Sequence, residues 1–235
     1  MRITALVPLA LVAGCTYEAR LPPSFFAEGA GVLAPGQTSI TAVGGGGTDF
    51  SGGAIGGGAR VRVGIGDDQE VGVEATAMDV KAETSVCVAD CDGEGTSYET
   101  IRAYSGTASW KYHFAPHVAL IAGLGMSDHQ AIDGTTGDYF GTSVTGSIAI
   151  VASRPLNPSL SFYAGGRLSF AEPIGAEPEE AAAAYAVSGV AGLDNAASDR
   201  VHLYLEAGPR LMGEGYDAYF PWLTVAAVAG VRIVL

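Results

Sequence analysis

Charged residues and long hydrophobic runs are both scarce in this 235-residue sequence. It contains no run of about 18 apolar residues, which excludes a transmembrane helix. Lysine and arginine number only 12 against 25 acidic residues, so the clustered basic surface that nucleic acid requires is lacking, and we exclude nucleic acid as a partner. Charged residues make up 16 % of the chain and apolar residues 48 %, although the net charge is −13. This combination is unusual for an acidic soluble protein.

Cysteine is also rare, and its three residues occur in two settings. Residues 1–13 begin with Met-Arg and continue as an apolar run, which is typical of a secretory signal. The end of this run, LVAGC over residues 11–15, resembles the bacterial lipobox, in which small residues precede an acylated cysteine. The resemblance implies a signal peptide over residues 1–14, a lipid on Cys15 and transfer to the outer membrane. The alternative is an ordinary signal peptide with an incidental cysteine.

The other two cysteines, Cys87 and Cys91, lie four positions apart in a polar stretch. No histidine or further cysteine is near enough to complete a metal site, so we predict a small disulfide in an oxidising compartment. Residues 15–36 contain Pro22-Pro23 and Pro35-Gly36 and predict a semi-rigid, lipidated tether. Residues 37–235 then form the single folded domain.

Beyond the tether, apolar and polar residues alternate with the period of two that is typical of β-strands. Positions 200–211 show it best, with Val, Leu, Ala and Pro on one parity and Arg, His, Tyr, Glu and Gly on the other. We count about ten such segments, with eight as the alternative. Their connections alternate between short ones at 66–69, 114–117, 153–158 and 194–200 and long ones at 46–53, 81–98, 127–138, 171–182 and 212–221.

This pattern predicts an all-β fold, a closed antiparallel up-and-down transmembrane β-barrel. Outer-membrane barrels have an even number of strands, short periplasmic turns and longer outer loops. The apolar parity would face lipid, and the small polar parity would fill a narrow lumen. A soluble β-sandwich also alternates, but its apolar face would be the inner one. We expect both chain termini on the periplasmic side and the long loops outside the cell.

By this pattern, residues 37–235 resemble the small bacterial outer-membrane barrels of the OmpA/OmpX type. Members of that group commonly end in an alternating strand closed by an aromatic residue, which the barrel-insertion machinery recognises. The last strand here keeps the alternation but ends in Leu235. The resemblance therefore implies two partners, the barrel-insertion machinery and outer-membrane lipid. Because Leu235 replaces the terminal aromatic residue, we expect the machinery to recognise this last strand more weakly.

Several charged residues fall on the polar parity and would lie inside the barrel. An isolated charge at membrane depth is costly, so we expect these residues to pair and to plug the lumen. In this hypothesis Glu74 and Glu206 bridge four arginines, which are Arg62, Arg167, Arg210 and Arg232. The predicted lumen network consists of Arg60, Arg62, Glu74, Lys111, Arg167, Glu206, Arg210 and Arg232, and Glu70 and His202 share its parity.

The predicted outer loops are acidic, so an extracellular partner or divalent cations could bind them, although solvated loops are the simpler explanation. Residues 90–95 partly resemble the start of an EF-hand, but Ile101 stands where that motif needs a glutamate. We therefore expect no specific metal site and no cofactor.

Ten-stranded barrels include the omptin proteases, which use acidic and histidine residues at the outer rim. Residues 127–129 (Ser-Asp-His) and Asp133 lie at the end of a predicted strand. His113 and His117 fall beside a short turn and His202 lies towards the same end, so no second rim histidine is available. A G-x-S-x-G elbow is also lacking. We expect no enzyme and no catalytic residues, but a structural or surface-interaction role; a rim protease, a lipid-modifying enzyme or a narrow channel is the alternative.

Overall fold

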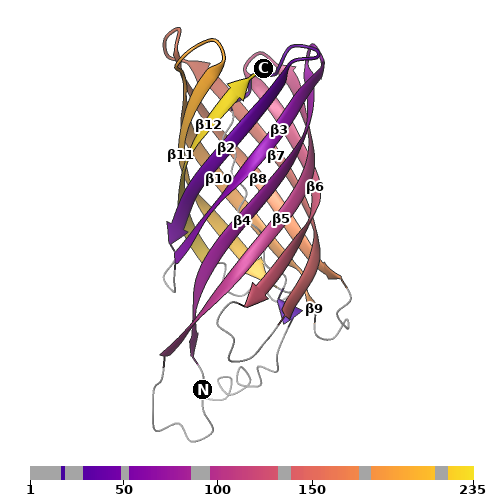
Figure 1. The fold of residues 1–235 in the computed structure, drawn as a ribbon, viewed down its shortest axis with the longest axis vertical. Helices are drawn as coiled ribbons and strands as arrows, with labels where there is room; N and C mark the ends of the chain where they lie inside the picture. Colours follow the sequence, from indigo (N-terminus) through magenta and orange to yellow (C-terminus); the bar gives the residue numbers. More distant parts are fainter. Residues whose placement is uncertain are drawn as a thin grey trace, which may run out of the picture.

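The computed structural model describes residues 17–18, 29–48, 53–85, 96–131, 139–174, 181–214 and 222–235. Within these ranges ten long strands form one closed barrel (Figure 1). Each pairs antiparallel with its neighbours along the chain, and the last strand pairs with the first to close the ring. The strands are β2 (Thr38–Thr48), β3 (Gly53–Gly66), β4 (Gln69–Ser85), β5 (Thr96–Ala115), β6 (Val118–Ala131), β7 (Tyr139–Pro155), β8 (Leu160–Ile174), β10 (Ala184–Ala196), β11 (Val201–Glu214) and β12 (Trp222–Val234).

The predicted fold class is confirmed, and the sandwich alternative is excluded, because the sheet closes on itself. Four short connections, at 67–68, 116–117, 156–159 and 197–200, lie at one end, called here the short-turn end. At the other, long-loop end, β4 and β5 extend further than expected, to Ser85 and from Thr96. Within the described part of the chain, no helix is long and apolar enough to span a membrane.

The turn between β5 and β6 shows how local sequence sets this end of the barrel. His117 has a positive φ of 69° and follows Pro116. A type II turn needs a residue with positive φ at its third position and favours proline at its second. The two-residue connection thereby brings β6 back beside β5, with which it pairs from Ala115 and Val118 onwards.

The barrel is apolar outside and polar inside. Large apolar side chains are exposed all around the ring, among them Val73 at 61 %, Leu124 at 63 % and Leu205 at 59 %. The inner face carries buried charged and hydroxyl side chains, such as Arg62 and Ser39. A soluble monomer rarely exposes apolar surface of this extent, so the outer face is suited to hydrocarbon.

The described part of the N-terminal region differs from the predicted tether. Tyr17–Glu18 (β1) pairs in parallel with Ala181–Ala182 (β9), just before β10 begins at the long-loop end (Figure 1). Leu235 lies at the opposite, short-turn end, where its N–H donates to the carbonyl of Thr38. The expectation that both ends of the chain lie on one side therefore does not hold for Tyr17–Glu18.

Candidate functional site

The stretch 29–36, called here the lumen segment, enters the barrel at the short-turn end of the lumen. Ala30 and Leu33 are buried there, whereas residues 34–36 are exposed and form the exit turn. Ala30 is completely buried against inward-facing side chains that include Ile121, Val151 and Tyr163. Sequence reasoning missed this placement, because small residues such as those at 29–31 are equally typical of a linker. Pro35-Gly36, which the sequence assigns to the tether, is where the chain leaves the lumen and enters β2.

The exit turn depends on two glycines. Gly36 has a φ of +79°, and the N–H of Gln37 donates to the carbonyl of Ala34 at 2.9 Å, so this is a proline-glycine turn. Gly64, on β3, faces the segment. A Cβ there would lie 2.2 Å from the carbonyl oxygen of Ala34, so glycine is required for the segment to pass this close.

Inward-facing side chains hold the segment by hydrogen bonds to its backbone. Lys111 donates from Nζ to the carbonyl oxygens of Gly29 at 2.9 Å and Gly31 at 2.6 Å. The N–H of Leu33 donates to Oε1 of Glu70 at 2.8 Å. The N–H of Ala30 donates to Oγ of Ser153 at 2.5 Å. Backbone groups removed from water in this way need such partners, so the contacts stabilise the segment inside the barrel.

Glu70 is the centre of the charge cluster beside the segment. Its Oε1 lies 3.9 Å from Nζ of Lys111, and its Oε2 lies 3.8 Å from Nη1 of Arg62. The side chains of Lys111 and Glu70 are 0 % and 2 % exposed. A buried carboxylate needs such cationic partners to offset its loss of hydration. Glu70 contacts both Lys111 and Arg62 and also accepts the hydrogen bond from the N–H of Leu33.

A second cluster lies further from the turns. Arg60 and Glu74 are direct cross-strand partners on β3 and β4. Nε of Arg60 donates to Oε2 of Glu74 at 2.6 Å, and its Nη2 forms an ion pair with the same oxygen. Cross-strand pairs of opposite charge stabilise a sheet, and here the pair also neutralises two charges at mid-barrel.

A third cluster lies on β8, β10, β11 and β12 and contains two residues that sequence reasoning missed. Tyr163 donates to Oε2 of Glu206 at 2.9 Å. Asp194 lies 2.8 Å from Nδ1 of His202 and 3.7 Å from Nη2 of Arg232. Asp194 was assigned to a turn, although the parity of β10 places it inside. Tyr163 is uncharged, so the search for charged residues on the polar parity did not select it, and its contact with Glu206 is visible only in the structure.

The two remaining predicted residues, Arg167 and Arg210, lie on either side of β10. Ser188 is the cross-strand partner of both, so the two arginines reach the lumen at the same level. All eight residues of the predicted network thus belong to the inner face. Glu74 pairs with Arg60, which is not among the four arginines that the hypothesis bridges, because cross-strand register decides which side chains meet.

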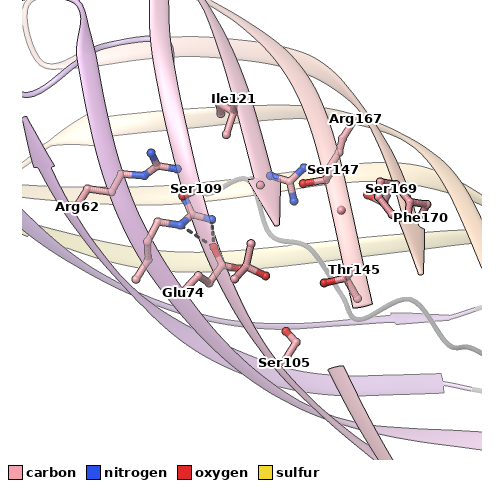
Figure 2. A pocket seen from close by; sticks show the side chains of 14 residues that line it. Arg62, Glu74, Ser105, Ser109, Ile121, Thr145, Ser147, Arg167, Ser169 and Phe170 are labelled. Atoms are coloured by element: carbon pink, nitrogen blue, oxygen red, sulfur yellow. Dashed lines mark hydrogen bonds and ion pairs between the residues drawn. The ribbon is translucent and has the colours of Figure 1, made fainter. Parts of the chain in front are cut away.

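A cavity lies beside these residues, within the wall formed by β3 to β8. About 50 Å³ of it is open to the centres of water molecules, which suits a few waters or one small ion. Figure 2 shows Arg62 and Arg167 approaching it from opposite sides, with Glu74 below Arg62. The other lining residues are of two kinds. Six carry hydroxyl groups, namely Ser105, Thr107, Ser109, Thr145, Ser147 and Ser169, and four do not, namely Ile121, Gly123, Gly146 and Phe170.

Among the candidate rim residues that the structure describes, Asp128 and His129 point to opposite faces of the sheet, whereas Ser127 shares the inner face with His129. His129 is 1 % exposed and points inwards from β6. Its neighbour Asp128 points to the opposite face, as adjacent strand residues must, and accepts hydrogen bonds from Gln130 and Thr142. Asp133, like Cys15, Cys87 and Cys91, lies outside the described residues. In the ranges that the structure describes, no group of three or more His, Cys, Asp or Glu could hold a metal ion.

The architecture defines the chain as a closed ten-stranded antiparallel β-barrel with a polar, partly filled lumen. No protein-family model matches the sequence, and no curated protein is similar to it. Similar solved structures include the outer membrane protease OmpT from Escherichia coli, with 9 % identity, a TM-score of 0.44 and coverage of 88 % of this chain and 100 % of that one. An outer membrane channel from Pseudomonas putida F1 has 9 % identity, a TM-score of 0.47 and coverage of 92 % and 100 %. The NanC porin has 10 % identity, a TM-score of 0.42 and coverage of 83 % and 98 %.

Proposed function

We propose that the chain is an outer-membrane barrel lipoprotein with a structural or surface-interaction role, whose lumen is closed to solutes. The apolar outer face supports the membrane location, since a closed barrel can cross hydrocarbon without unpaired backbone groups. The lumen segment carries the closure: Lys111, Glu70 and Ser153 hold residues 29–36 where a pore would otherwise pass.

The aromatic residues at the short-turn end support the same orientation in a membrane. Trp110 and Tyr112 stack with their ring centroids 5.6 Å apart, and Phe114 is half-exposed nearby. Such rings are typical of the level at which lipid headgroups begin. We place this end in the periplasm and the long loops outside the cell, where an extracellular partner or divalent cations would meet acidic residues. The disulfide between Cys87 and Cys91 belongs to the same proposal.

The position of Tyr17–Glu18 adds a consequence for the lipid. Cys15 precedes this strand by two residues, and β1 lies with the long loops. If Cys15 is acylated, we propose that the lipid enters the outer leaflet rather than the periplasmic one. The resemblance to OmpA/OmpX-type barrels stays a prediction, as does the absence of enzymatic activity; the opposed directions of Asp128 and His129 support the latter.

Conductance in planar lipid bilayers tests the closure. The wild-type protein is expected to show no porin-like unitary conductance, whereas deletion of residues 29–35 should open an ion path. Deletion of residues 19–25, which has the same length and lies upstream, is the matched control. Steady conductance by the wild type would refute the closed lumen. A slower mobility after boiling on a gel verifies that each variant forms a barrel.

A further inference from the structure

The inner face of the barrel has the opposite charge balance to the whole protein. The chain carries a net charge of −13. The charged side chains that the structure describes on the inner face are instead mainly cationic. They are Arg60, Arg62, Lys111, Arg167, Arg210 and Arg232 against Glu70, Glu74, Asp194 and Glu206. A lumen with excess positive charge inside an acidic protein attracts anions.

This excess is concentrated at the cavity between β3 and β8. Three guanidinium groups line it, from Arg60, Arg62 and Arg167, and Glu74 is the one carboxylate among the residues that line it. Glu74 is engaged by Arg60 through two nitrogens. Six hydroxyl groups add donors on the wall formed by β5, β7 and β8. The cavity therefore offers several hydrogen-bond donors and carries a net positive charge among its lining residues, beside an apolar part formed by Ile121 and Phe170.

We propose that this cavity binds one small inorganic oxyanion, phosphate or sulfate, between Arg62 and Arg167. The planar fork of a guanidinium matches two oxygens of such an ion, and an ionic hydrogen bond is strengthened where water is largely excluded. The volume of about 50 Å³ suits an ion of this size. Sites for organic ligands are typically several times larger, which argues against a sugar or nucleotide.

The site does not depend on the proposed closure of the lumen. Its lining residues Thr145 and Ser169 lie towards the long-loop ends of their strands, whereas Arg62 and Ile121 line its short-turn side, next to the lumen segment. The lumen segment is held instead by Lys111 and Ser153, which lie towards the short-turn end. Lys111, Glu70 and Ser153, which hold the segment, are not among the residues that line the cavity, so anion binding does not require the closure.

Equilibrium dialysis with radiolabelled sulfate and phosphate tests the proposal, using the full chain folded in zwitterionic detergent at constant ionic strength. One saturable site per barrel is expected, and Arg167→Gln should weaken it about tenfold or more, the effect of losing one charge-assisted contact worth about 1.4 kcal/mol. Glu74→Gln should strengthen binding, because it removes the carboxylate that competes with the anion. Arg102→Gln, on the outer face, is the matched control and should bind like the wild type.

Folding of every variant is verified by its mobility before and after boiling. If Arg167→Gln does not fold, Arg167→Lys keeps the charge but loses the planar fork, and it should bind several-fold more weakly. Absence of saturable binding to the folded wild type would overturn the proposal. Unchanged binding in the folded Arg167 variants, or an equal loss in Arg102→Gln, would also overturn it. A conducting barrel that still binds the anion would refute only the closed lumen.

Discussion

Replacement of Lys111 by methionine tests the anchoring of the lumen segment most directly. The ammonium group is completely buried, donates to the carbonyls of Gly29 and Gly31, and faces Glu70. Methionine keeps a similar length but leaves both carbonyls and the carboxylate without this donor. Removing one partner of a buried charge pair typically costs about 3–5 kcal/mol. We expect Lys111→Met to lower the free energy of unfolding by about that amount.

The assay is equilibrium unfolding in guanidinium chloride from lipid vesicles, followed by tryptophan fluorescence. Arg102→Met is the matched control, because Arg102 forms an ion pair with Asp79 at 2.6 Å on the outer face, where the two side chains are 42 % and 37 % exposed. Solvent screening makes such pairs weak, so no resolved change is expected there. If Lys111→Met loses no more stability than Arg102→Met, the segment is not anchored as described.

Three further predictions concern the outer face of the barrel, the contact of Gly64 with the lumen segment and the lipid on Cys15. Leu124→Arg, at mid-strand on the outer face, should destabilise the barrel in vesicles by about 2–4 kcal/mol, whereas Ile65→Arg, near the short-turn end, should cost about 0–1 kcal/mol; equal costs would contradict a membrane-spanning outer face. Gly64→Ala should cost about 1–3 kcal/mol in the same assay because its Cβ would meet the lumen segment, and Gly106→Ala, with nothing within 4 Å, should be neutral. Cys15→Ala should remove the lipid mass seen by mass spectrometry of the intact protein; an unchanged mass difference from the calculated polypeptide would refute acylation.

The outer face of the barrel was the most predictable feature, because a period of two assigns each strand residue to one side. The parity of β11 places Leu205 outside and Glu206 inside, as expected. Pairings inside the lumen were less predictable, because they depend on register between strands. Arg60 meets Glu74 because of the register between β3 and β4, and the sequence of neither strand alone indicates that register.

The position of the lumen segment inside the barrel was the feature that the sequence predicted least well. Its residues are uncharged and mostly small, so neither periodicity nor charge distinguishes a filled lumen from an external linker. Its anchors, Lys111 and Ser153, are about 80 and 123 positions away in the sequence. Asp194 was missed for a simpler reason, since β10 continues two residues beyond it, to Ala196, where a turn was expected.

The order of synthesis and the order of ring closure are opposed in this chain. The lumen segment is made before any barrel strand, whereas β12, the strand that seals the ring against β2, is made last. A finished ring would admit the segment only by threading, because the exit turn ties it directly to β2. Closure of the seam between β2 and β12 around a segment already in place would avoid this threading, and the segment would then serve as a core around which the wall is assembled.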